Sequence, residues 1–260
     1  MPPNKRPNHQ PRTPPTTVGS ASRTVDVAPA RLSGWVSGFA SRHGEFKLRI
    51  VDEVVTLTAA DGSTAVLEPP FPPMPAGWAD NACATDPIAA LVAHAVAPRV
   101  IGLLLVRLGG YAAGTFDGGE LTASKVGSRQ VHGRSAAGGW SQQRFARRRE
   151  GQVRVALDAA VEAAVRVIVP ALPGSSGTSR PSGSSGLCCV VTGGDRQALR
   201  SVLADSRLSG LKPLLAPRVL DVPDPKARVL RDAYAAAVAI RITITDGTPA
   251  THGLDATGAG

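Results

Sequence analysis

The stretch Val100-Ile101-Gly102-Leu103-Leu104-Leu105-Val106 is an unbroken apolar run of the length expected for a fully buried strand. Two turn signals follow it, Gly109-Gly110 and Asp117-Gly118-Gly119. They separate two further strand-like segments, 111–116 and 120–131. The sequence therefore predicts a three-stranded meander that starts at this run.

C-terminal to the meander, a long helix is predicted from Ser141 to Val169, where Pro170 ends it. Its apolar residues recur at three-, four- and eight-residue steps, which place them on one helical face. These residues are Phe145, Val153, Leu157, Val161, Val165 and Ile168. Residues 171–186 are Ser, Gly or Pro at 12 of 16 positions and are expected to form a flexible loop.

The remaining segments alternate between strand and helix. A buried strand is predicted at 187–191, then a helix capped by Asp195, and a strand around 214–222 in which Pro217 favours an edge position. A last helix would carry Val229, Leu230, Ala233, Val238 and Ile240. This order predicts an α/β (α+β) fold with a mixed β-sheet flanked by helices.

The N-terminal third has a different composition. Residues 1–30 hold seven of the 22 prolines and few large apolar residues, so a disordered basic arm is expected, either solvated or tethered to RNA. Residues 31–97 form a small β-containing module. Phe46, Leu48 and Ile50 alternate as in a half-buried strand, a hairpin turns at 60–63, and an Ala-rich helix spans 82–96. A polar, disordered tail is expected at 247–260.

The net charge of +9, from 29 Lys and Arg against 20 Asp and Glu, indicates a polyanionic partner, nucleic acid before membrane. The chain has neither an apolar run long enough to span a membrane nor a secretory signal, which favours a cytoplasmic protein. Its three cysteines lack the spacing of a metal site, and Cys188 and Cys189 are expected to be buried, inert thiols.

Most of the excess charge falls between residues 125 and 154. Only Glu150 opposes the basic residues there, which are Lys125, Arg129, Arg134, Arg144, Arg147, Arg148, Arg149 and Arg154. A Gly-rich loop, 132–139, precedes the helix, and four glycines (Gly127, Gly133, Gly138 and Gly139) would keep it thin and mobile. A basic loop before a helix favours phosphate contact, with Ser141 as the N-cap. The motifs of a nucleotide-binding loop are missing, so no cofactor is expected.

The segment Gly138-Gly139-Trp140-Ser141-Gln142-Gln143-Arg144-Phe145-Ala146-Arg147-Arg148-Arg149 resembles Gly-Gly-Gln-Ser-Ala-Leu-Arg-Phe-Ala-Arg-Leu-Arg, found in the middle domain of archaeal and eukaryotic class-1 peptide release factors. Trp140 stands where that family has its catalytic glutamine. Gly139-Trp140-Ser141-Gln142 instead fits the relaxed form Gly-x-Ser/Thr-Gln of the Vms-like release factors. The chain thus resembles a bacterial branch of this family of peptidyl-tRNA hydrolases, with a release-factor-like catalytic domain over 98–246.

The resemblance implies hydrolysis of the peptidyl-tRNA ester in ribosome rescue, with the large ribosomal subunit, ribosomal RNA and peptidyl-tRNA as partners and no metal. Gln142 would place the water, Gly138 and Gly139 would shape the loop, and Ser141 would start the helix. Gln143 is the rival for the catalytic position, and His132 is a candidate general base. Trp140 either stacks on a base or anchors the loop. The residues expected to contact RNA phosphates are Arg134, Arg144, Arg147, Arg148 and Arg149, with Lys125 and Arg129.

Two other functions stay open at this point. Trp140 at the strict motif position favours a non-catalytic ribosome- or RNA-binding module. Cleavage of the tRNA strand itself is the third possibility, although the sequence shows no carboxylate and metal arrangement for nuclease chemistry.

Overall fold

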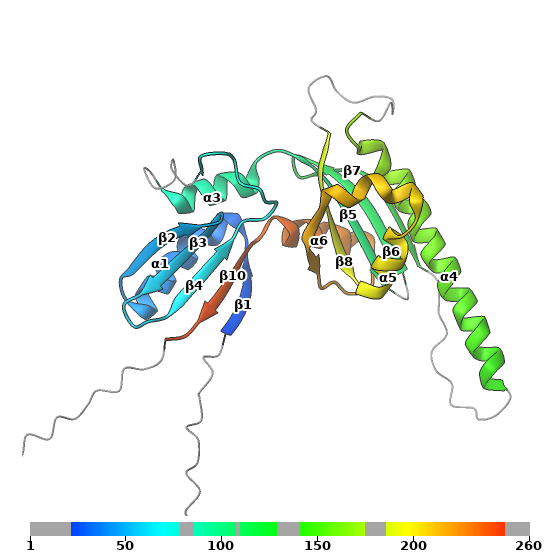
Figure 1. Ribbon diagram of the computed structural model, residues 1–260, viewed down its shortest axis with the longest axis horizontal. Coiled ribbons are helices and arrows are strands. Elements are labelled where there is room, and N and C mark those ends of the chain that lie inside the picture. Colours follow the sequence, from blue (N-terminus) through cyan, green and yellow to red (C-terminus); the bar gives the residue numbers. More distant parts are fainter. Residues whose placement is uncertain (1–21, 79–85, 108–109, 129–140, 175–185, 248–260) are drawn as a thin grey trace, which may run out of the picture.

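A computed structural model describes residues 22–78, 86–107, 110–128, 141–174 and 186–247; for residues 141–149 it describes the helix but not the side chains. The chain builds two five-stranded sheets (Figure 1). None of the described helices is long and apolar enough to cross a membrane.

The first sheet has the strand order β1-β10-β4-β3-β2, and every neighbouring pair is antiparallel. Its strands are β1 (Ser22–Val27), β2 (Phe46–Val51), β3 (Val54–Ala59), β4 (Thr64–Glu68) and β10 (Ile240–Thr245). Helices α1 (Leu32–His43) and α3 (Pro87–Val96) contribute side chains to the core on one of its faces. The predicted alternation of Phe46, Leu48 and Ile50 and the predicted hairpin are confirmed.

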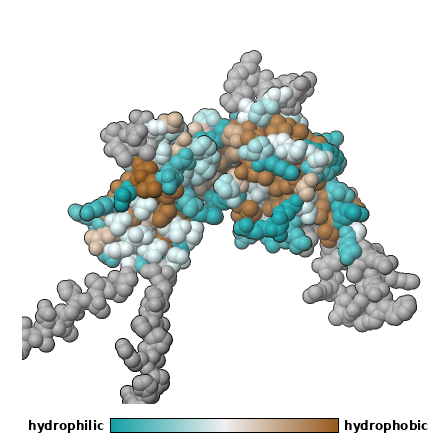
Figure 2. All heavy atoms as spheres, viewed as in Figure 1, coloured by the Kyte–Doolittle hydropathy of each residue, from teal (hydrophilic) through white to brown (hydrophobic). Residues whose placement is uncertain are grey.

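The opposite face of the first sheet is turned toward the viewer in Figure 1, with α1 behind it. Six threonines share this face, because paired residues of adjacent strands point the same way. They are Thr24, Thr56, Thr58, Thr64, Thr243 and Thr245, and this part of the surface is pale in Figure 2. The first sheet is therefore polar on one face and apolar on the other.

The second sheet has the order β7-β6-β5-β8-β9. Its strands are β5 (Val100–Arg107), β6 (Gly110–Asp117), β7 (Glu120–Ser128), β8 (Leu187–Gly194) and β9 (Leu215–Leu220). β5, β6 and β7 form the predicted meander, whereas β8 runs parallel to β5 and β9 runs parallel to β8. The sheet is therefore mixed, as predicted, with Pro217 on the edge strand β9.

Helices cover both faces of the second sheet. On one face lie α4 (Ser141–Val167), α5 (Arg196–Leu203) and a 3₁₀ helix, Ser206–Leu214; on the other lies α6 (Ala227–Val238). The alternating residues of β5 divide between the two cores, Leu104 and Val106 on the α4 side and Leu103 and Leu105 on the α6 side. Asp195 caps α5 as predicted, because its Oδ1 accepts from the backbone N–H of Ala198 at 2.7 Å.

Two expectations for the ends of the chain need correction. Residues 22–27 form strand β1 rather than part of a disordered arm, and they pair with β10. Ile240 belongs to β10, not to the last helix, so the C-terminal strand lies in the sheet of the N-terminal module. The physical reason is period-two patterning: Val25 and Val27 alternate with polar residues, and β10 does the same. The rest of the predicted arm and most of the tail lie outside the described residues.

Other differences are local. The long helix ends at Val167 and passes into a 3₁₀ turn, Val169–Ala171, so the predicted loop at 171–186 begins with an ordered turn. The Ala-rich helix begins at Pro87, where Asp86 accepts from two backbone N–H groups as the N-cap. Most of the loop, 175–185, lies outside the described residues.

Candidate functional site

The basic Gly-rich segment connects the end of β7 at Ser128 to the start of α4 at Ser141. Residues 129–140, and with them Arg129, His132, Arg134, Gly138, Gly139 and Trp140, lie outside the described residues. For the other site candidates the structure describes only the helical backbone of α4; these are Ser141, Gln142, Gln143, Arg144, Arg147, Arg148 and Arg149. What the structure describes of the site is therefore the two ends of the segment, Ser128 on β7 and Ser141 on α4, which are called its anchors, and the contacts that hold these two elements in place.

Of the residues of helix α4 whose side chains are described, those that are fully buried lie near its C-terminal end. Among its residues with described side chains, the first buried one is Ala160. With a helical rise of 1.5 Å per residue, Ser141 lies about 28 Å along the helix axis from Ala160. The N-terminal turns accordingly extend past the second sheet (Figure 1). Helix α4 is thus an arm whose free end carries the C-terminal anchor of the loop.

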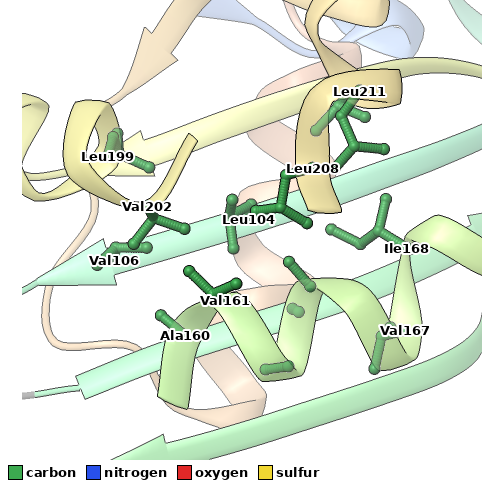
Figure 3. Packing of buried hydrophobic residues seen from close by; sticks show 14 of the residues in the cluster. Leu104, Val106, Ala160, Val161, Val167, Ile168, Leu199, Val202, Leu208 and Leu211 are labelled. Atoms are coloured by element: carbon green, nitrogen blue, oxygen red, sulfur yellow. The ribbon is translucent and has the colours of Figure 1, made fainter. Parts of the chain in front are cut away.

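The packed half of α4 fixes the direction of this arm. Val161, and Ile168 just after the end of α4, point toward Leu104 of β5 (Figure 3), and Ala160 and Val167 belong to the same buried cluster, which also includes residues of α5 and the 3₁₀ helix. The partners labelled there are Leu104, Val106, Leu199, Val202, Leu208 and Leu211. Thr115 adds a buried hydrogen bond, because its Oγ1 donates to the carbonyl oxygen of Val167 at 2.8 Å. One end of the arm is therefore held by the main core of the protein.

Tyr111 connects the base of the arm to the base of the loop. It pairs with Gly127 across β6 and β7, and a Cβ atom at position 127 would overlap the Tyr111 ring. A small cavity beside the ring is lined by Val153 and Leu157 of α4, so Tyr111 lies between the loop anchor and the helix. Gly127 was expected to be a mobile loop glycine, but it lies in β7, where its missing side chain admits the ring.

Tyr111 was not among the predicted site residues. The signal for it is an aromatic residue paired across the sheet with a strand glycine, which is recognisable only once the register of β6 and β7 is known. Sequence spacing alone does not give that register.

Lys125 is the one RNA-contact candidate with a described side chain. It is exposed on β7 and pairs with Ala113, which belongs to the core that α4 covers. Because paired residues share a face of the sheet, Lys125 lies on the same face as α4. The structure thus brings one basic candidate to the side of the sheet from which the arm extends.

Charge is distributed unevenly along α4. Residues 141–154 contain five arginines and one glutamate, whereas residues 155–167 contain Asp158, Glu162 and Arg166. Beside the packed half of α4, Arg207 of the 3₁₀ helix forms ion pairs with Glu162 of α4 and with Asp205. The Arg207 guanidinium holds the pKa of the Asp205 carboxyl below its usual value. The carboxylate Glu162 is therefore balanced locally, and the excess positive charge of α4 belongs to its free half.

A groove of about 600 Å³ lies between the arm and α5. Its apolar floor comes from Val153, Leu157 and Val161, and acidic residues outnumber the one arginine on its rim. The rim residues are Glu150, Arg154, Asp158 and Asp205. This groove is chemically unlike the basic end of the arm, so it does not extend the candidate site for a polyanion.

Comparison with known proteins adds three findings. The profile of the family described as the Actinobacteria/chloroflexi VLRF1 release factor matches residues 99–243. A crystal structure of the archaeal translation termination factor aRF1 is 15% identical, with a TM-score of 0.39, covering 84% of this chain and 67% of that one. A second structure, of an archaeal protein, is 16% identical, with a TM-score of 0.36, covering 82% and 65% respectively. The chain thus spans about two thirds of either structure's length. No curated protein sequence matches it.

Proposed function

Because the chain belongs to the actinobacterial and chloroflexi VLRF1 release factor family, we propose that it hydrolyses the ester bond of peptidyl-tRNA on stalled ribosomes or large ribosomal subunits. A glutamine at the junction of the Gly-rich loop and α4, Gln142 with Gln143 as its rival, positions the attacking water. The family identifies a release factor, and the reaction and its residues are the proposal.

The observation that carries the proposal is the arm. Helix α4 extends past the second sheet at its N-terminal end (Figure 1), and its first fully buried described residue lies about 28 Å along the axis from Ser141, so it can present its N-terminus in a narrow space while the body stays outside. The ester of a peptidyl-tRNA lies at the 3′ end of the tRNA, inside a cavity walled by RNA. Five arginines in the free half of α4 favour entry into such a polyanionic cavity.

The chemistry assigned to the glutamine is positioning. Its amide is neither an acid nor a base near neutral pH, but it donates and accepts hydrogen bonds. A water held by the amide attacks the ester carbonyl carbon, the bond to the 3′ oxygen of the tRNA breaks, and that oxygen takes up a proton. Proton transfer is left to RNA hydroxyls and water. Holding the water in the reactive geometry lowers the barrier by several kcal/mol, about a hundredfold or more in rate.

The other candidates receive supporting roles. Gly138 and Gly139 give the loop its shape, Ser141 starts α4, and Trp140 stacks on a base or anchors the loop. Arg144, Arg147, Arg148 and Arg149 contact phosphates from the arm, and Lys125 does so from β7. Arg129 and Arg134 contact phosphates from the loop itself.

The test is single-turnover release of a labelled peptide from peptidyl-tRNA on purified large subunits. Wild-type protein is compared with Gln142→Ala, Gln143→Ala and the double variant. We expect Gln142→Ala to release peptide at least about a hundredfold more slowly while it still cosediments with the subunits. Gln197→Ala is the matched control, since Gln197 is an exposed glutamine on α5.

The outcomes separate the candidate functions. Loss of release in Gln143→Ala alone assigns the role to the rival residue. Full activity in the double variant contradicts the glutamine mechanism. Wild-type protein that binds with a steep salt dependence but releases nothing is a non-catalytic module, and tRNA shortened on a denaturing gel shows strand cleavage instead.

A further inference from the structure

The start of β8 contains a β-bulge with two adjacent cysteines. Val100 of β5 pairs with Leu187, and the next residue, Ile101, pairs with Cys189, so Cys188 is an extra residue in the strand. In a regular strand, successive side chains point to opposite faces of the sheet. The bulge removes this alternation at one position.

As a result, the two sulfur atoms lie close together. The Sγ atoms of Cys188 and Cys189 are 3.7 Å apart, within hydrogen-bonding distance for sulfur. Cys188 is exposed and Cys189 is buried in the core beneath α6. The expectation that both thiols are buried is therefore wrong for Cys188. The pair consists of one accessible thiol with a second, protected thiol beside it.

A fixed cation lies near the pair. Arg99 precedes β5, its Nη2 donates to the carbonyl oxygen of His94 at 2.8 Å, and its guanidinium lies 5.0 Å from the centre of the Phe71 ring. Its buried Nη1 has no hydrogen-bond partner among the described residues. The hydrogen bond between Cys188 and Cys189, helped by the positive charge of Arg99, lowers the pKa of Cys188 to about 7. The same hydrogen bond and burial raise the pKa of Cys189.

We propose that Cys188 and Cys189 form a reversible two-electron redox site that reacts with hydroperoxides. The Cys188 thiolate attacks a peroxide oxygen, so the O–O bond breaks, an S–O bond forms and Cys188 becomes a sulfenic acid; the other oxygen leaves as hydroxide, or as an alkoxide from an organic hydroperoxide, and takes up the proton that the Cys188 thiol released to become water or an alcohol. The Cys189 sulfur then attacks Cys188, the S–O bond breaks and water leaves with the proton of Cys189. The sum is two thiols and one hydrogen peroxide giving one disulfide and two waters.

The disulfide that forms is strained and therefore easily reduced. Adjacent Cα atoms across a trans peptide are about 3.8 Å apart, whereas an unstrained disulfide needs about 4.4 Å or more. Strained, accessible disulfides have the more oxidising potentials typical of regulatory bonds. A cellular dithiol or thiol pool then restores the reduced pair.

This site lies away from the proposed release site. It is at the N-terminal ends of the parallel strands β5 and β8, whereas the loop anchor Ser128 pairs with Gly110 beside Arg107, at the other end of β5. The proposal concerns a second activity, and its test does not depend on the proposed release function.

The experiment uses the full chain in a Cys83→Ser background, so that only the paired cysteines react. Protein is exposed to hydrogen peroxide, alkylated and digested, and the mass of the peptide with both cysteines is measured. We expect a product lighter by two hydrogens that dithiothreitol converts back. In Cys189→Ser the sulfenic acid at Cys188 persists and is trapped by dimedone, and in Cys188→Ser the protected Cys189 stays reduced. Circular dichroism verifies that each variant folds.

Two results overturn the proposal. One is a pair that stays fully reduced at peroxide concentrations that oxidise a free cysteine added to the sample. The other is conversion of Cys188 to the sulfinic acid while Cys189 remains a free thiol.

Discussion

Tyr111 lies over Gly127 where β6 and β7 pair, and this contact joins the base of the loop to the base of the arm. A strand glycine has no side chain to pack, so an aromatic residue opposite it can lie flat on the backbone. The space between them is closed by α4 residues that line the adjoining cavity. This residue pair thus lies between the end of β7 and helix α4.

The substitution Gly127→Ala tests this contact. An added methyl group overlaps the Tyr111 ring, so the ring or the strand must shift, and we expect the free energy of unfolding to fall by about 1–3 kcal/mol. Urea denaturation followed by circular dichroism measures it. Gly34→Ala is the control: position 34 lies in α1 with open space around it, so alanine stabilises by about 0.5–1 kcal/mol. Equal stability of wild type and Gly127→Ala contradicts the assigned packing.

At the scale of elements, α4 combines a packed half with a free half. Gly151, shortly before the boundary between the two halves, is exposed, and a methyl group added there would meet no neighbouring element within 4 Å. A break at this position separates the basic turns from the core-bound turns without touching the core.

Gly151→Pro and Gly151→Ala form a matched pair at this position. Proline inside a helix removes a hydrogen bond and costs about 3 kcal/mol locally, so we expect Gly151→Pro to lose peptide release. The global unfolding midpoint changes little, because residues 150–159 contribute no fully buried side chain. Alanine at the same position strengthens the helix and keeps release. The release assay and thermal unfolding check both variants, and wild-type release by Gly151→Pro shows that a continuous arm is unnecessary.

A helix or strand can be predicted from the sequence when the pattern that specifies it lies within a few consecutive residues. The run from Val100 to Val106, the hairpin around 60–63 and the cap at Asp195 are local patterns, and they are confirmed. Strands β1 and β10 were missed because each is short and gains its partner from the opposite end of the chain. The basic Gly-rich segment is contiguous in sequence and stays a prediction, because residues 129–140 lie outside the described residues, whereas recognising Tyr111 requires the strand register.

At the scale of the whole molecule, the first and last described strands belong to one sheet, and the release-factor-like sheet is inserted between them. Arg218 of β9 forms an ion pair with Asp26 of β1, and Arg241 of β10 contacts the same carboxylate at 3.4 Å. Arg218 also donates to the carbonyl oxygen of Ala239 at 3.3 Å. These contacts join the two sheets on the side away from α4. The first sheet and the arm therefore lie on different sides of the second sheet (Figure 1).

The most direct test of the central claim is where the tip of the arm lies in a complex with large subunits that carry peptidyl-tRNA. A photo-crosslinking benzoylphenylalanine is placed at position 140, and at Val96, an exposed site in the other module, as the control. We expect position 140 to crosslink to the 3′ end of the tRNA or to the ribosomal RNA around it, and position 96 not to. Crosslinks from position 140 only to this protein itself, or to RNA remote from the tRNA 3′ end, contradict this expectation.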